Sequence, residues 1–235
     1  KNDDVVDYHA AIGFNVSGAT AHDGTNVKKR FNQGNNIHLK AAGLPSNKNV
    51  DIYIIKFYPR NNWKRDLVNL SANKINATGL TNPVTKQTSN TGVLQEQLWT
   101  NPSQEDILNT GGRYNIVIDV DRNGIYTPGM DVVDAVNINE LEKAIRKSVF
   151  LKKGNKGDGI IELKSFLNAW AGSNLDPTNN EFDVATENAL KAYTEKAGPV
   201  QTGTLIFEVF ERIWRDSRTS FVIEDNKSPN VTIKS

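Results

Sequence analysis

A run of oxygen-bearing side chains in the middle of the chain has the composition of a calcium-binding loop. Calcium takes about six to eight hard oxygen ligands, and side chains at alternate positions of a tight loop can converge on one ion. The candidate ligands are the side chains of Asp119, Asp121, Asn123 and Asp131 and the carbonyl oxygen of Ile125. Gly124 suits the sharp turn of such a loop. Met130 stands where a bidentate carboxylate is expected, so that Asp131 comes one residue late. The sequence predicts calcium as the candidate cofactor.

The same residues have a second interpretation that needs no metal. Asp-x-Asn-Gly is also typical of a β-hairpin turn, in which short polar side chains accept hydrogen bonds from nearby backbone amides. The carboxylates would then be solvated or would cap backbone N–H groups. If calcium does bind, we expect it to stiffen the hairpin and not to take part in catalysis.

Side chains for catalysis are scarce in this sequence. The chain has no cysteine, which excludes thiolate nucleophiles, thiolate zinc sites and disulfides. Its histidines are His9, His22 and His38, without a His-Glu-x-x-His pattern, and no Gly-x-Ser-x-Gly motif occurs. We therefore predict that the protein is not an enzyme. A carboxylate pair for glycoside hydrolysis stays open as an alternative, because sequence spacing does not reveal such pairs.

The acidic loop ends a region that has the pattern of β-strands. Short segments of alternating apolar and polar residues, separated by Gly, Asn and Pro clusters, favour antiparallel strands. Examples are residues 37–41, 50–55 and 114–120. No amphipathic helix intervenes, so the sequence predicts an antiparallel β-sandwich over residues 1–136. The cluster Lys28-Lys29-Arg30 within it is interpreted as a solvated loop, because crowded like charges repel.

From about Ile138 the apolar residues follow a helical spacing. We predict a helical connector over residues 137–149 and a small three-helix domain over residues 150–216, with Asp183 or Thr186 capping one helix. The fold class is thus α+β with two domains. Because the connector is helical and not rich in Gly and Ser, we expect a fixed orientation between them.

The segment after the helices, residues 217–235, has an extended pattern. Its apolar run Phe221-Val222-Ile223 is consistent with two arrangements. It either returns to the sandwich as a strand or leads into another domain, and both alternatives stay open.

The helical half resembles the peptidoglycan-binding-like domain of bacterial cell-wall proteins over about residues 148–215. The resemblance rests on the order and spacing of apolar positions in three segments. These are Leu151-Lys152-Lys153-Gly154-Asn155-Lys156-Gly157 with Ile160, Leu163 and Phe166-Leu167-Asn168; Glu181-Phe182-Asp183-Val184-Ala185-Thr186 through Tyr193; and Lys196-Ala197-Gly198 with Thr202-Gly203. The family's usual polar or turn residues are replaced in the pairs Leu163-Lys164, Phe182-Asp183 and Tyr193-Thr194. Polar positions are the better candidates for ligand contact, and we assign this role to Lys164, Asn168, Asp183 and Thr194.

The strand half resembles immunoglobulin-like domains of secreted bacterial proteins over about residues 8–136. The motif Gly112-Arg113-Tyr114-Asn115-Ile116-Val117-Ile118-Asp119 carries this resemblance. It continues through Asp121-Arg122-Asn123-Gly124-Ile125-Tyr126 to Gly129-Met130-Asp131. The resemblance implies an immunoglobulin-like β-sandwich.

Aromatic residues are weighed in the same way. Trp170 and Tyr193 lie on apolar helical stripes and are expected in the core. Trp63, beside Asn61-Asn62 and Lys64-Arg65, is a candidate for contact with a sugar or a partner.

The charge balance and the hydropathy of the chain limit the classes of partner that the sequence predicts. Lys and Arg number 28 against 27 Asp and Glu, a net charge of +1, which provides no broad positive field for nucleic acid. No apolar run reaches the roughly 18 residues that would predict a membrane span. A glycan or protein partner is therefore favoured.

Together the two resemblances imply a non-enzymatic binding module that is extracellular or part of a bacterial cell envelope. The helical domain would bind cell-wall peptidoglycan or another glycan, with the sandwich as a spacer or adhesion domain. Envelope proteins are further candidate partners. The main alternative is a structural or protein-interaction module that keeps the helical fold without the ligand, and the second is a carbohydrate-active enzyme with an unrecognised carboxylate pair.

Overall fold

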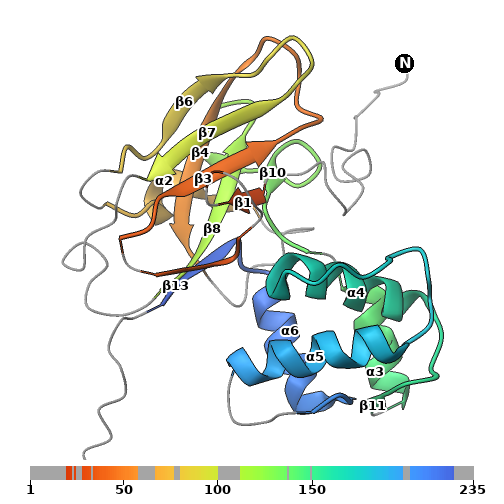
Figure 1. Cartoon of the computed structure of the whole chain (residues 1–235). Coiled ribbons are helices and arrows are strands. Elements are labelled where there is room, and N and C mark those ends of the chain that lie inside the picture. The colour runs from red at the N-terminus through yellow and green to blue at the C-terminus, as the bar shows by residue number, and fades with distance from the viewer. Residues whose placement is uncertain are drawn as a thin grey trace, which may run out of the picture.

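The structure, a computed structural model, describes residues 20–22, 24, 28–32, 34–57, 67–76, 80–99, 112–136, 138–148, 150–197 and 202–224. It has a mixed α/β architecture, with a β-rich unit beside a helical unit (Figure 1). In the described part of the chain, no helix combines the length and the apolar character needed to cross a bilayer.

The β-rich unit contains two main sheets. The smaller sheet has three strands in the order β1 (Thr20–His22), β3 (Ile37–Ala41) and β7 (Leu94–Trp99). The larger has six. Its path runs through β2 (Arg30–Asn32), β13 (Phe221–Glu224), β8 (Gly112–Asp119), β4 (Asn49–Lys56) and β6 (Val84–Gln87), and β10 (Val132–Val133) pairs with β8. Neighbouring strands are antiparallel, as predicted, except that β13 runs parallel to β2.

One apolar core joins the two sheets. Inward side chains of both sheets meet in it, for example Leu39 of β3 and Ile116 of β8. Phe221 of β13 stacks on Tyr114 with ring centroids 5.3 Å apart, and Phe31 of β2 meets Phe221 edge-on at 5.8 Å. A strand from the C-terminal part of the chain is thus integral to the core of the β-rich unit.

The central strands β4 and β8 are buried on both faces. A second apolar cluster covers the side of the larger sheet that faces away from the first core. Its members are Tyr53, Ile55, Val68, Leu70, Val117 and Tyr126. The covering elements are the helix α2 (Leu70–Asn73) and the paired strands β5 (Val68–Asn69) and β9 (Ile125–Tyr126). Strict alternation is lost in β4 because α2, β5 and β9 place a second apolar layer over it.

In the residues that the structure describes, the helical unit has four helices and a two-stranded sheet. They are α3 (Asn139–Ser148), β11 (Phe150–Leu151), α4 (Asp158–Ala171), α5 (Val184–Ala197), β12 (Leu205–Ile206) and α6 (Phe207–Ser217). The helix α3 lies in the segment predicted as a connector, yet its Leu141 and Ile145 belong to the same core as the other helices. Trp170 and Tyr193 are buried in that core, which confirms the prediction for both.

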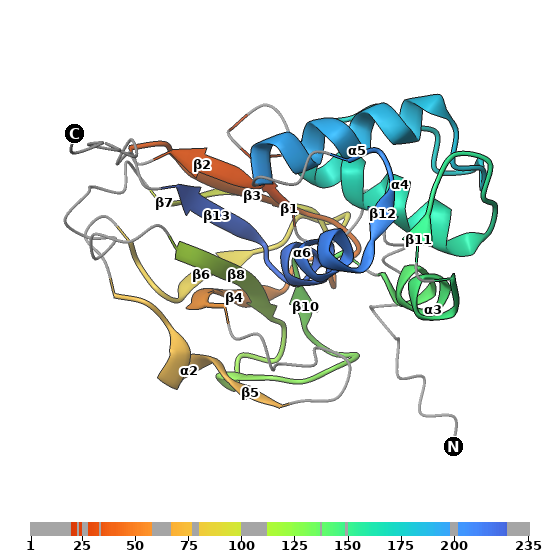
Figure 2. The same ribbon diagram turned by 90° about the horizontal axis from the view of Figure 1, so that it is seen from below.

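The helical unit is inserted between two strands of the β-rich unit. The strand β13 returns to the larger sheet and lies between β2 and β8 (Figure 2), so that the first of the two alternatives for the tail is confirmed at Phe221–Glu224. Where the chain leaves and re-enters the β-rich unit, the Val136 N–H donates to the Ser217 carbonyl at 2.7 Å, and the Ser220 N–H donates to the Tyr114 carbonyl at 2.9 Å. The β-rich unit therefore contains segments from both sides of the helical unit.

The basic cluster at residues 28–30 is not the solvated loop that the sequence predicts. Lys29 is buried, and its Nζ lies 2.5 and 2.6 Å from the two carboxylate oxygens of Asp134, which is also buried. The Ala21 N–H donates to the same carboxylate at 3.0 Å. A buried cation needs such a partner, and this one follows β10, more than a hundred residues along the chain. Arg30 pairs with Glu224 of β13 at 2.6 Å.

Candidate metal centre and ligand-contact residues

The acidic loop connects β8 to β10 and begins at a buried carboxylate. Asp119, the last residue of β8, is inaccessible to solvent. One of its oxygens accepts the N–H of Arg122 at 2.7 Å and that of Asn123 at 3.3 Å, and the other accepts the Gly124 N–H at 2.7 Å. Asp119 thus fixes the tight turn that follows it.

A second buried carboxylate holds the other end of the loop. Asp131 accepts the Val120 N–H on one oxygen and the Thr127 N–H on the other, each at 2.7 Å. These contacts confirm the backbone-capping role that the metal-free interpretation predicts. They leave open whether the same oxygens also hold a cation, because each carboxylate oxygen has more than one acceptor direction.

The turn between these residues has the backbone that the sequence predicts. Gly124 has a φ of +78°, and a β-carbon there would come within 2.6 Å of the Ser71 hydroxyl oxygen. The Gly124 carbonyl accepts the Leu70 N–H at 2.8 Å, which docks the turn on α2. The loop and the second apolar cluster therefore support each other.

Three of the five predicted calcium ligands come together. Carboxylate oxygens of Asp119, Asp121 and Asp131 all lie within 4.8 Å of one another, and Asp121 is exposed. The side-chain oxygen of Asn123 instead accepts the Ile125 N–H at 2.7 Å, and its amide nitrogen donates to Asp121 at 2.7 Å. Ile125 lies in β9 with an exposed side chain. The donor set is made of hard oxygens and suits calcium.

Burial and neighbouring negative charges disfavour the ionised forms of the carboxylates in this cluster. Burial raises the pKa of Asp131 to about 7; hydrogen bonds from the N–H groups of Val120 and Thr127 oppose this rise, and the negative charges of Asp119 and Asp121 add to it. Burial likewise raises the pKa of Asp119. A cation in contact with these oxygens would favour their charged forms. The residues therefore fit a calcium ion, which would neutralise crowded negative charge.

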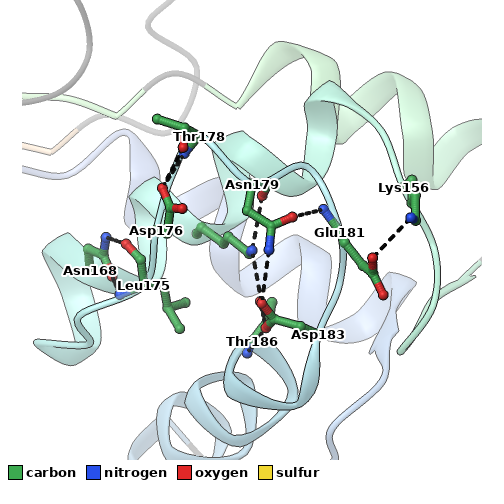
Figure 3. Close-up of polar contacts among 10 residues, drawn as sticks. Lys156, Asn168, Leu175, Asp176, Thr178, Asn179, Glu181, Asp183 and Thr186 are labelled. Atoms are coloured by element: carbon green, nitrogen blue, oxygen red, sulfur yellow. Dashed lines mark hydrogen bonds and ion pairs between the residues drawn. The ribbon is translucent and has the colours of Figure 1, made fainter.

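The four predicted ligand-contact residues of the helical unit all contact their own chain. Lys164 is 1% exposed; its Nζ donates to the Asn179 carbonyl at 2.9 Å and lies 3.3 Å from an oxygen of Asp183. The other Asp183 oxygen accepts the N–H and the hydroxyl of Thr186, both at 2.8 Å. Asp183 is therefore the cap at the start of α5, as predicted, and Figure 3 shows it beside Asn179 and Thr186.

Asn168 and Thr194 close turns in the same way. The side-chain amide of Asn168 donates to the Leu175 carbonyl at 2.9 Å and accepts the Leu175 N–H at 2.8 Å (Figure 3). Thr194 is buried; its hydroxyl donates to the Lys191 carbonyl of the same helix at 2.9 Å and accepts the Thr202 N–H, beyond the end of α5, at 3.4 Å. The four residues predicted to contact a ligand thus contact the loops of the helical unit.

Sequence reasoning missed a polar network where the two units meet. Asp216 of α6 is buried; it accepts the Tyr193 hydroxyl at 2.8 Å and forms an ion pair with Arg113 of β8. The Arg113 guanidinium also donates to the Thr219 hydroxyl at 3.4 Å. No local motif could have revealed these partners, because Arg113 and Asp216 lie on different units and far apart in the sequence.

No family model, curated protein or solved structure matches this chain. Trp63 and the part of the predicted extended segment beyond residue 224 lie outside the described residues.

Proposed function

We propose that the protein is a non-enzymatic binding module of a bacterial cell envelope or its exterior, whose helical unit contacts cell-wall glycan. The observation that carries this proposal is the insertion of the helical unit between β10 and β13. Both of its ends are tied to the β-rich unit by strand pairing and backbone hydrogen bonds. A unit that is attached at both of its ends presents its binding surface in a defined direction.

The same proposal assigns the β-rich unit to the immunoglobulin-like class, as a spacer or adhesion domain. Two sheets that share one core support this assignment. In it, the loop from Asp119 to Asp131 binds calcium as a structural ion. The three carboxylates within 4.8 Å of one another support that role.

One observation favours the protein-interaction alternative. The four predicted ligand-contact residues form hydrogen bonds with their own chain; they are Lys164, Asn168, Asp183 and Thr194. A glycan would therefore have to be held by other residues. If no such residues exist, the helical unit keeps its fold without a glycan ligand, and its partner is another envelope protein.

Co-sedimentation of the intact protein with purified peptidoglycan sacculi separates these functions. We expect the protein to sediment with sacculi both in calcium and in a chelator, which supports a wall-binding module with a structural ion. Sedimentation in calcium alone would make the acidic loop part of the binding mechanism. Absence of sedimentation in both conditions would favour the protein-interaction alternative.

A gel assay for digestion of purified cell wall tests the non-enzymatic part of the proposal. We expect no clear zone around the protein. A clear zone would support the third alternative, a carbohydrate-active enzyme with a carboxylate pair, and would overturn our proposal.

A further inference from the structure

Two aromatic side chains of the helical unit are exposed. Phe150 is 44% and Phe207 is 52% exposed, and they are the aromatic members of the exposed large apolar residues that the structure describes. Single exposed apolar residues are ordinary on a protein surface. These two, however, lie on neighbouring segments, because Phe150 of β11 pairs with Ile206 of β12 and Phe207 follows directly.

The small sheet of β11 and β12, which carries Phe150 and directly precedes Phe207, lies at the far end of the helical unit. In both ribbon views β11 lies on the side of the helices away from the large sheets (Figures 1 and 2). The strands β11 and β12 are two residues long. So small a surface falls far short of the roughly 800 Å² per partner that a stable protein interface buries, but it suits one or two sugar rings.

One basic side chain lies beside the Phe150 ring, and two more are close to Phe150 in the sequence. The Nζ of Lys152 lies 5.4 Å from the centre of the Phe150 ring. Lys147 and Lys153 are also exposed, three residues before and after Phe150 in the sequence. The negative charge that faces this end comes from the exposed Glu208, next to Phe207, and from Glu187, whose pKa is lowered mainly by Lys191 and in smaller part by Lys153.

Other basic residues nearby are neutralised by carboxylates. Arg146 pairs with Glu142 at 2.7 Å, and Lys156 pairs with Glu181 at 3.0 Å. For Lys147 and Lys152, in contrast, the described residues provide no carboxylate within ion-pair distance. The Lys152 ammonium beside the exposed Phe150 ring is complementary to a ligand with both an apolar face and negative charge.

We propose that Phe150, Phe207 and Lys152 form the contact site for a glycan strand that carries carboxylates. The C–H face of a sugar would lie against the exposed aromatic surface, and the ammonium of Lys152 would pair with a carboxylate of the glycan. This inference rests on the proposed function and deepens it. It assigns wall binding to this end of the helical unit in place of the four inward-facing polar residues.

Binding of single variants to purified sacculi tests the site. We expect Phe150→Ala to weaken binding about tenfold, and Phe207→Ala and Lys152→Gln to weaken it by smaller factors. Matched controls are Leu67→Ala and Lys40→Gln, because both residues are exposed on the β-rich unit. We expect both controls to bind like the parent protein. The substituted side chains are exposed, so the thermal midpoints should stay close to that of the parent protein.

The outcomes distinguish the inference from the function on which it rests. If the parent protein binds sacculi and Phe150→Ala and Lys152→Gln bind equally well, the proposed function stands and this site is wrong. If the parent protein does not bind sacculi, both are wrong. An uncharged polymer of N-acetylglucosamine tests the carboxylate. We expect weaker binding to it than to sacculi, and equal binding would overturn the assignment of a charged ligand.

Discussion

At the scale of single residues, Asp119 and Asp131 hold the two ends of one loop. Both are buried, and each accepts backbone N–H groups on both oxygens. These hydrogen bonds explain how the loop keeps its shape without an ion. Burial is the main cause that raises the pKa of Asp131, and the negative charges of Asp119 and Asp121 add to the rise. This property makes calcium binding testable.

The first prediction concerns stability against pH. The pKa of Asp131 is about 7 in the folded protein and 3.8 ordinarily, so between these values the folded state keeps a proton that the unfolded chain has released. Its stabilising contribution is therefore full below about pH 4 and is lost as the pH rises through 7. In a chelator, we expect a lower free energy of unfolding at about pH 8 than at about pH 5.5. Urea titration, monitored by tryptophan fluorescence, measures the free energy of unfolding at each pH.

Calcium and a variant control this experiment. Added calcium should restore stability at the higher pH, because it favours the charged carboxylates. Asp131→Asn cannot titrate at this position and should lose most of the pH slope. A parent protein whose stability rises with pH over this range would contradict the prediction.

The second prediction separates capping from metal binding. In a chelator, Asp119→Ala should destabilise the protein by about 2–3 kcal/mol, because it removes the acceptor of the buried Gly124 N–H and of the partly buried N–H groups of Arg122 and Asn123. Asp121 is exposed, and Asp121→Ala should cost no more than about 0.5 kcal/mol. In thermal melting we expect calcium to stabilise the parent protein, and we expect both variants to lose this stabilisation. Full stabilisation of Asp121→Ala by calcium would exclude Asp121 as a ligand.

At the scale of secondary-structure elements, much of the fold could be predicted from apolar spacing. The strands over residues 37–41 and 114–119, the helices α3 to α6 and the Asp183 cap all follow local patterns. Contacts between distant segments could not be predicted. The parallel pairing of β13 with β2 and the burial of Lys29 against Asp134 depend on the path of the whole chain.

The ligand-contact residues show the same limit of local reasoning. A polar residue beside an apolar framework position has the same sequence pattern whether it faces a ligand or its own loop. Lys164 could be assigned only when the structure placed the Asn179 carbonyl and Asp183 beside its Nζ.

The third prediction concerns the cap of α5. Asp183→Ala should cost about 1 kcal/mol at neutral pH, measured by thermal melting. Asp158→Ala, in the first turn of α4, is the control and should cost less. Partial burial acts to raise the pKa of Asp183, but hydrogen bonds from Thr186 and the contact with Lys164 outweigh it and lower the pKa. The contribution of Asp183 is therefore present above its ordinary pKa and is lost as the pH falls below it.

If Asp183→Ala matched the parent protein at neutral pH, the capping role would be contradicted. Its effect on glycan binding is a separate readout. Because Asp183 contacts its own loop, we expect the folded variant to bind sacculi as the parent protein does. A loss of binding at unchanged stability would show that Asp183 contacts the ligand.

At the scale of the whole molecule, the insertion of the helical unit decides how the two units are joined. The chain crosses between them twice, and the Val136–Ser217 hydrogen bond ties the two crossings together. The contacts of Asp216 with Tyr193 and Arg113 add a buried link. A fixed orientation, as expected from the helical segment at residues 139–148, is therefore our prediction for the protein in solution.

The fourth prediction tests that link. Small-angle scattering of the parent protein should be described by one arrangement of the units. Asp216→Ala leaves Arg113 and the Tyr193 hydroxyl without this partner, so we expect a loss of about 2–4 kcal/mol in the free energy of unfolding. We also expect the scattering of this variant to require a wider range of orientations between the two units. Glu224→Ala removes a more exposed ion pair with Arg30 and should cost no more than about 1 kcal/mol. A parent profile that requires many orientations would contradict the account.

The most direct test of the central claim, that the protein is a wall-binding module, is co-sedimentation of the intact protein with purified sacculi in calcium and in a chelator. We predict that the protein sediments with the sacculi in both conditions, with calcium acting on stability alone. Protein that stays in the supernatant in both conditions would contradict the claim.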